Sequence, residues 1–373
     1  MTLGSLFDGS GTCCLAGEMT GIEPKWLAEI DPFCCKVTAN RFPGVPNLGD
    51  VKKIDGSSIE PVDVITFGSP CTSLSLAGSR KGLAEDAPSS IFFEAIRIIR
   101  EMRNATNGKY PRFAMWENVR GSLSTNHGED FRTVLESFLE APVPKPDKWH
   151  STGCIMAAGR SVAWRVLDAQ YWGVAQRRAR IYLVCDFGGS RAGEILFKQE
   201  GLPGDFDACR APWQEHTRTT ADGNRNEGTG VTRKWLVDNH SNDSRYTLRS
   251  GNEPCQTLVS RMGTGGNNQP FVLEEVMTYT QGRYTDPPQE DSLAMTLKST
   301  DHKRIAVGAM VLTPQYRVRR ITPFECQRLQ GFPDDYLDGV DGSDTAKYKM
   351  WGNGMALPCV LYVMNGIRKG GYA

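Results

Sequence analysis

The stretch MTLGSLFDGSGTCCLAGEMTG (residues 1–21) decides the fold, because a glycine turn at 7–11 joins a short apolar run to a helical pattern. Glycines at such a turn permit close approach of a ligand, and the N–H groups that open a helix suit a nucleotide-like molecule. The turn departs from the GxGxxG pattern, since Cys14 occupies the third glycine position. That departure disfavours a pyrophosphate-binding dinucleotide loop and a nicotinamide oxidoreductase.

The same alternation of apolar runs and helical patterns continues to about residue 187. Strands that alternate with helices predict an α/β fold with a mostly parallel sheet, covered by helices on both faces. The expected strands cover 1–7, 25–30, 62–67, 112–116, 161–169 and 180–187, and the expected helices cover 12–21, 31–41, 90–102 and 130–141.

The segment 187–316 has a different character, with many Gly, Thr, Asn, Asp and Arg residues and only short apolar runs. This composition predicts a smaller domain of short strands and long loops. Two stretches within it, 244–260 and 282–299, share Arg-Tyr and Thr-Leu pairs, either by chance or as a duplicated β unit. Helical patterns return afterwards, first at a capping box formed by Thr322 and Glu325 and last over 357–367.

Composition narrows the class of protein. The 43 Lys and Arg residues balance 43 Asp and Glu residues, so a globally basic nucleic-acid coat protein is disfavoured. No stretch approaches the roughly 18 apolar residues of a membrane span, and no signal peptide is recognisable, so a cytoplasmic protein is expected. The 11 cysteines include no CxxC pair, which predicts no metal site and buried thiols in a reducing compartment.

Two acidic residues follow predicted strands and suit an adenosine pocket. Glu29 ends a strand 18 residues after Gly11, where an acid can bind a ribose diol, and Asp50 lies at another strand end. Either residue alone could instead be a turn or cap residue.

A cysteine and three charged residues also lie at the ends of predicted strands. Cys71 follows a strand in a polar loop that Pro70 stiffens, where a thiolate could act as a nucleophile, although a buried thiol is the alternative. Glu117 ends the next strand, and a partly desolvated carboxyl there could donate a proton. Arg178 and Arg180 fall on one side of an extended chain and suit carbonyl or anionic oxygens, unless they form only a solvated basic patch.

Taken in order, eight blocks of the sequence resemble those of DNA cytosine-5 methyltransferases of the bacterial and phage type. The resemblance covers about 1–186 and 317–373, with a long variable segment between. The blocks are FDGSG (7–11), Glu29, GDV (49–51), SPC (69–71), ENV (117–119), QRRAR (176–180), RRITPFECQRLQGFP (319–333) and GNGMALP (352–358).

The resemblance implies a class I methyltransferase fold with a Rossmann-like sheet. It implies an S-adenosylmethionine-binding catalytic domain over 1–186 plus 317–373 and a target recognition domain over 187–316. The expected activity is transfer of a methyl group to carbon 5 of a cytosine that is flipped out of a double-stranded DNA sequence.

Roles carry over residue by residue. Cys71 matches the nucleophile that attacks carbon 6, and Glu117 the acid that bonds ring nitrogen 3 and the exocyclic amine. Arg180 matches the residue that binds the 2-carbonyl oxygen, and Arg178 the one that orients Glu117. The residues matching cofactor contacts are Phe7, Gly9, Gly11, Glu29, Asp50, Val51, Pro70, Asn353 and Met355.

Three departures concern contacts rather than catalytic groups. Thr72 stands where glutamine is usual, Thr12 where a small residue is common, and APSSIFF at 87–93 replaces a more usual Arg-Ser-Gly-Leu-Phe. Residues 76–89 resemble the loop that closes over the flipped base.

Double-stranded DNA is the expected partner, bound by a monomer. The resemblance leaves open whether a restriction endonuclease for the same site accompanies it. The alternatives are a transfer-RNA-type cytosine-5 methyltransferase and a non-catalytic DNA-binding homologue; the long variable segment and the presence of Cys71, Glu117 and Arg180 argue against them. Base-reading side chains are expected among arginines of the variable segment, namely Arg210, Arg218, Arg225, Arg233, Arg245, Arg249, Arg261 and Arg283.

Overall fold

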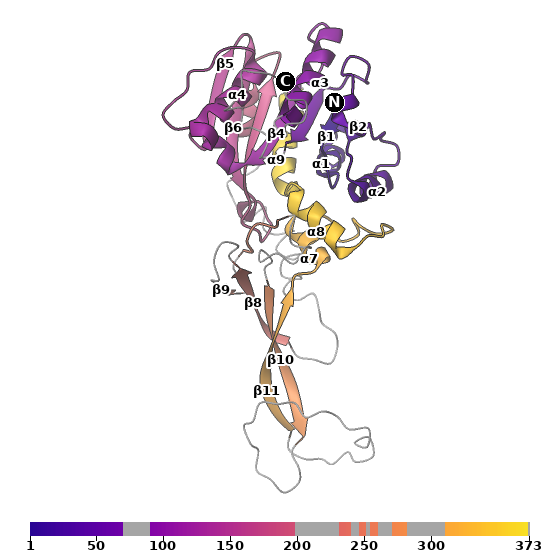
Figure 1. Ribbon diagram of the computed structural model, residues 1–373, viewed down its shortest axis with the longest axis vertical. Helices are drawn as coiled ribbons and strands as arrows, with labels where there is room; N and C mark the ends of the chain where they lie inside the picture. Colours follow the sequence, from indigo (N-terminus) through magenta and orange to yellow (C-terminus); the bar gives the residue numbers. More distant parts are fainter. Residues whose placement is uncertain are drawn as a thin grey trace.

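The computed structural model describes residues 1–69, 90–197, 231–239, 246–250, 254–259, 271–281 and 310–371. These residues form two sheets, one of seven strands and one of four (Figure 1). Pro70, Cys71, Thr72, the loop at 76–89 and six of the arginines expected to read bases lie outside the described residues.

The seven-stranded sheet has the order β2-β1-β3-β4-β7-β6-β5. Its first four strands run parallel, which confirms the predicted parallel core, and the last three run antiparallel to their neighbours. The edge strand β5, which was not predicted, alternates between more and less exposed residues. The strands are β1 (Thr2–Leu6), β2 (Glu23–Ala28), β3 (Val64–Gly68), β4 (Phe113–Val119), β5 (Thr152–Ala157), β6 (Arg160–Asp168) and β7 (Ala179–Asp186).

Alternate residues of each central strand point to opposite faces, so each face has its own apolar core. On β4, Met115 packs in one core with α1 and α9, while Trp116 packs in the other with α3 and α4. The prediction that helices cover both faces is therefore confirmed. The helices are α1 (Thr12–Thr20), α2 (Pro32–Arg41), α3 (Ser90–Ala105), α4 (Glu129–Leu139), α5 (Ala192–Phe197), α7 (Pro323–Leu329), α8 (Asp344–Asn353) and α9 (Leu357–Gly370).

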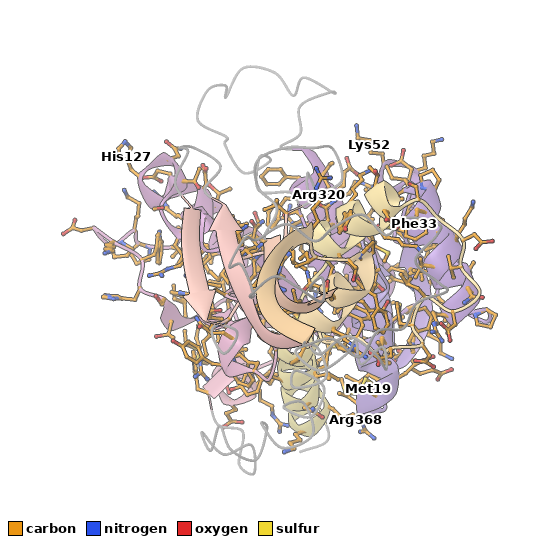
Figure 2. The ribbon with its side chains drawn as sticks, turned by 90° about the horizontal axis from the view of Figure 1, so that it is seen from below. Met19, Phe33, Lys52, His127, Arg320 and Arg368 are labelled. Atoms are coloured by element: carbon orange, nitrogen blue, oxygen red, sulfur yellow. The ribbon has the colours of Figure 1, made fainter. Side chains whose placement is uncertain are left out.

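The last part of the chain folds back on the first. Helix α9 packs along α1, and Figure 2 shows Met19 and Arg368 at the same edge of the molecule. The expected capping box is present, because the Thr322 hydroxyl accepts from the Glu325 N–H at 3.1 Å and the Glu325 carboxylate accepts from the Thr322 N–H at 2.7 Å. Asp31 caps α2 as expected and pairs with Lys349 of α8 at 2.7 Å.

The four-stranded sheet is antiparallel, with the order β11-β10-β8-β9, and extends away from the seven-stranded body (Figure 1). Seen from below, the four-stranded sheet lies in front of the seven-stranded body, and Arg320 marks the end of β11 next to the body (Figure 2). The strands are β8 (Val231–Asn239), β9 (Tyr246–Ser250), β10 (Phe271–Gln281) and β11 (Met310–Arg320), of which the last two are longer than predicted. Within the described ranges, no helix has the length and apolar character needed to span a membrane.

Candidate functional site

Four parallel strands end at the same edge of the sheet, and the predicted site residues follow them. The turn at 7–11 follows β1, Glu29 follows β2, Gly68 ends β3 and Glu117 lies near the end of β4. Gly68 and Glu117 are direct partners in the ladder between β3 and β4. The carboxyl edge of a parallel sheet is where α/β folds bind ligands, so the strand order brings these groups to one place.

Ser69 is the last described residue before Pro70 and Cys71, and it is held firmly. The Trp116 indole N–H donates to the Ser69 hydroxyl at 3.1 Å, and the Asn118 amide donates to the Ser69 carbonyl at 3.0 Å. Both donors flank Glu117 on β4. The chain that leads to Cys71 is thus anchored to the strand that carries Glu117.

Glu117 is buried, with 8% of its surface exposed, and its Oε1 lies 3.4 Å from Arg180 Nε. Burial raises the pKa of the Glu117 carboxyl, while the positive charges of Arg180 and Arg178 oppose that rise. A carboxyl in this position can hold a proton more readily than a solvated glutamate and can donate it to a bound group.

Arg178 is 2% exposed and makes its side-chain hydrogen bonds to backbone carbonyls. It donates to Leu258 O at 3.1 Å, Gly352 O at 3.2 Å and Gly354 O at 2.6 Å. Burial, with the nearby Arg180 charge, lowers the pKa of Arg178 to about 9, which leaves it charged at neutral pH. Arg180 contacts the Glu117 carboxylate directly, whereas Arg178 acts on Glu117 through its charge.

Gly68 was not singled out from the sequence, although it lies at the centre of the site. A Cβ atom on this residue would come within 2.7 Å of Met355 Cε and 3.2 Å of Glu117 Oε2. Met355 is itself buried, with its sulfur 3.9 Å from Cys13 Sγ. The absence of a side chain at position 68 therefore lets Met355 and Glu117 approach each other.

The turn at 7–11 is built from left-handed backbone, with φ of +56° at Phe7, +55° at Gly9 and +79° at Gly11. The Asp8 carboxylate caps α1 by accepting from the Cys13 N–H at 2.9 Å. A Cβ on Gly9 would meet no atom within 4 Å, so open space faces the turn there. This space is what an approaching ligand requires.

Tyr336 fixes the turn from a position 326 residues away in sequence. Its hydroxyl donates to the Ser10 carbonyl at 2.5 Å, and a Cβ on Gly11 would lie 2.8 Å from that hydroxyl. The contact depends on the C-terminal part folding back, so no local pattern in the sequence could indicate it.

Glu29 and Asp50, the two predicted adenosine-pocket acids, both accept backbone N–H groups. Glu29 accepts from Gly9 at 2.9 Å and from Ile30 and Asp31 at 2.8 Å, while Asp50 accepts from Lys52 at 3.0 Å and begins η1 (Val51–Lys53). The cap interpretation of Asp50 is therefore confirmed, although a cap does not preclude ligand contact.

Three further residues border this region. Ile30 is 70% exposed directly after Glu29, and it was not singled out from the sequence. Val51 is buried in the apolar core, whereas Asn353, at the end of α8, is exposed.

Most described cysteines are poor candidates for a nucleophile. Burial raises the pKa of the Cys13, Cys14, Cys185 and Cys326 thiols well above the ordinary range, which disfavours their thiolate forms. Cys154 on β5 is exposed, so the expectation that every cysteine besides Cys71 is buried was wrong there. Among the described residues, no group of His, Cys, Asp and Glu side chains could hold a metal ion.

Residues 1–369 match the family described as C-5 cytosine-specific DNA methylase. A protein of Escherichia phage P1 named DNA N-6-adenine-methyltransferase is 28% identical over 98% of this chain, which spans only 61% of that protein's length. Type II methyltransferase M1.ScrFI of Lactococcus lactis subsp. cremoris is 28% identical, covering 95% of this chain and 75% of the relative. Type II methyltransferase M.HhaI of Haemophilus parahaemolyticus is 25% identical, covering 96% and 91%.

Solved structures agree on the fold. The Dnmt2 methyltransferase of S. pombe superposes with a TM-score of 0.58 at 14% identity, covering all of both chains. A prophage-encoded protein of E. coli, assigned as a DNA modification methyltransferase, superposes with a TM-score of 0.53 at 15% identity, covering 99% of both chains.

Proposed function

Because the chain belongs to the C-5 cytosine-specific DNA methylase family, a family of DNA cytosine methyltransferases, we propose that it methylates carbon 5 of a cytosine flipped out of double-stranded DNA. The observation that carries most weight is the buried Glu117 carboxylate beside Arg180, paired in the sheet with Gly68, three residues before Cys71.

S-adenosylmethionine is the proposed methyl donor, and when bound it supplies an electrophilic methyl group. The open space at Gly9, the exposed Ile30 and the Glu29 carboxylate fit an adenosine, and the lack of a third turn glycine fits a ligand without a pyrophosphate. Phe7, Gly11, Asp50, Val51, Pro70, Asn353 and Met355 are the further residues proposed to contact it.

In the proposed mechanism the Cys71 thiolate forms a bond to carbon 6 of the cytosine, and Glu117 donates a proton to ring nitrogen 3. The added electron density makes carbon 5 nucleophilic, so that it accepts the methyl group. Carbon 5 then gives its proton to water, the electron pair left behind expels Cys71 as the thiolate from carbon 6, and ring nitrogen 3 returns its proton to Glu117. Arg180 binds the 2-carbonyl oxygen, and the charge of Arg178 favours the ionised form of Glu117 once its proton has left.

The separation of the two sheets supports a catalytic domain over 1–186 plus 317–373 and a target recognition domain within 187–316. Three short stretches depart from these bounds, since α5 and residues 254–259 pack in the body and β11 continues to Arg320. We propose that a monomer acts on DNA in the cytoplasm of a bacterial or phage-infected cell. The Type II relatives favour a partner restriction endonuclease that cuts the same sequence.

The direct test is to incubate the protein with methyl-labelled S-adenosylmethionine and duplex DNA and to separate the digested nucleosides. Label is expected in 5-methyldeoxycytidine and is expected to be lost in a Cys71→Ala variant. Label in N6-methyldeoxyadenosine, the product that the name of the phage P1 relative indicates, would contradict the proposal. Label only in transfer RNA would favour the RNA enzyme, and DNA binding without any label would favour the non-catalytic homologue.

A further inference from the structure

Residues 254–259 lie within the variable segment, between β9 and β10, yet they bond to the seven-stranded body. The Cys255 N–H donates to Ala175 O at 2.7 Å, and the Arg177 N–H donates to Cys255 O at 2.8 Å, which makes a parallel bridge between Cys255 and Gln176. Cys255 and Leu258 are buried in the body. This short stretch is therefore part of the catalytic body, although the sequence assigns it to the recognition domain.

Gln176 extends this attachment with both ends of its side chain. It is fully buried, its Oε1 accepts from the Leu258 N–H at 3.2 Å, and its Nε2 donates to Leu329 O at 2.9 Å. The Thr257 hydroxyl donates to the carbonyl of Arg177. The bonds of Leu258 and Thr257 tie residues 254–259 to the chain directly before Arg178, and the bond to Leu329 O joins α7 to the same cluster.

Arg178 completes the connection. Its Nη1 donates to Leu258 O, while its Nη2 donates to Gly352 O and Gly354 O beside Met355. One buried guanidinium thus bonds at once to the segment between β9 and β10 and to the chain that carries Met355. Because interior groups are closely packed, a shift of 254–259 must move Arg178 or break its bond to Leu258.

We propose that residues 254–259 act as a strut that sets the position of Arg178, and through it the Arg180–Glu117 pair, with Thr257 and Gln176 as positioning residues. The inference rests on the proposed function. The strut is continuous in sequence with β9 and β10. Binding of DNA to the four-stranded sheet would therefore change the positions of Arg178 and of the Arg180–Glu117 pair. The strut should therefore control the rate of methyl transfer more than the affinity for DNA.

The test compares Thr257→Val, which removes the hydroxyl with little change of shape, with Thr257→Ser, which retains it. For Thr257→Val, kcat should fall about five- to tenfold, the loss typical of one hydrogen bond, while KM for S-adenosylmethionine and Kd for duplex DNA stay within about twofold. Thr257→Ser should restore kcat. Thr133→Val is the matched control, because the Thr133 hydroxyl bonds the Glu129 carbonyl of α4 at 3.0 Å, away from the site.

An unchanged kcat in Thr257→Val would overturn the inference, as would equal loss in Thr257→Ser. An effect confined to Kd for DNA would instead make Thr257 a DNA contact and would also overturn it. If Thr257→Val unfolds, Gln176→Met offers a second route, because it removes the acceptor for the Leu258 N–H and keeps the length of the side chain. A fall in kcat with unchanged Kd for DNA is again expected, and an unchanged kcat would overturn the inference. Absence of methyl transfer by the wild-type protein would contradict the proposed function itself, so the two failures are distinguishable.

Discussion

Arg180 Nε lies 3.4 Å from Glu117 Oε1, and the two side chains are only 15% and 11% exposed. The pair joins a strand of the parallel half of the sheet to the antiparallel strand β7, at the edge of the sheet where β3 ends, three residues before Cys71. A charge contact so shielded from water depends little on salt, while the cost of removing both charges from water offsets its attraction. Its chemistry depends on whether Glu117 carries a proton.

The substitution Glu117→Gln should lower methyl transfer at least about 100-fold, the contribution typical of a positioned general acid. Glutamine preserves the shape and one amide donor but cannot supply a proton to ring nitrogen 3. Steady-state kcat measured beside Cys71→Ala checks this, and activity within about tenfold of the wild type would remove Glu117 from the proposed role.

The same substitution should stabilise the fold at alkaline pH. Burial raises the pKa of Glu117 in the folded state, so the folded protein binds the proton more tightly than the unfolded chain does. The wild type then loses stability as pH rises through the folded pKa, whereas the glutamine variant doesn't titrate. The unfolding midpoint of Glu117→Gln should exceed that of the wild type at about pH 8, and the two should converge at about pH 4, near the pKa of an unfolded glutamate. A gap that widens toward acid pH would contradict the raised pKa.

Gly68→Ala should disturb both Met355, a proposed cofactor contact, and Glu117, the proposed proton donor. The new Cβ would lie 2.7 Å from Met355 Cε and 3.2 Å from Glu117 Oε2, closer than such contacts normally allow. We expect KM for S-adenosylmethionine to rise and kcat to fall, each about tenfold or more. Gly44→Ala is the control, since a Cβ there meets nothing within 4 Å. Wild-type kinetics in Gly68→Ala would show that the close approach has no functional consequence.

Tyr336→Phe should weaken cofactor binding selectively. The variant loses the hydrogen bond from the hydroxyl to Ser10 O, which fixes the turn at 7–11. KM for S-adenosylmethionine should rise about three- to tenfold with little change in kcat. Tyr348→Phe is the matched control, because it loses a similar bond, to Ile321 O, at 2.5 Å, away from the turn. Equal effects in the two variants would indicate a loss of stability rather than of cofactor contact.

The sequence predicted what depends on local pattern. The apolar run over 112–116 and the helical spacing over 90–102 predicted elements that the structure contains, and the polar groups at strand ends do meet at one edge. Helix α8 was missed, because its sequence DTAKYKMWGN has no clear apolar stripe and its burial comes from packing against α2 and α7.

The parts of the site that were missed depend on contacts between distant residues. In the sequence, Gly68 is an ordinary residue at the end of a strand, and its role follows only from the nearby Met355 side chain. Tyr336 is likewise one of several aromatic residues, and its role follows only from its hydrogen bond to Ser10 O. The boundary of the variable segment was likewise drawn from composition, which cannot show that 254–259 pair with 175–177. The positions of such distant segments relative to one another are fixed only when the whole chain has folded, so a local sequence pattern does not indicate these contacts.

The most direct measurement is covalent trapping on duplex DNA of mixed sequence in which 5-fluorocytosine replaces cytosine. Carbon 5 of this base carries fluorine in place of the proton that must leave, so the bond between Cys71 and carbon 6 should persist once the methyl group has been transferred. The account predicts a denaturation-resistant protein–DNA complex that forms only with S-adenosylmethionine, maps to Cys71 by peptide mass spectrometry and is absent in Cys71→Ser. An adduct on another cysteine, or no adduct from a protein that methylates unmodified cytosine in DNA, would contradict it.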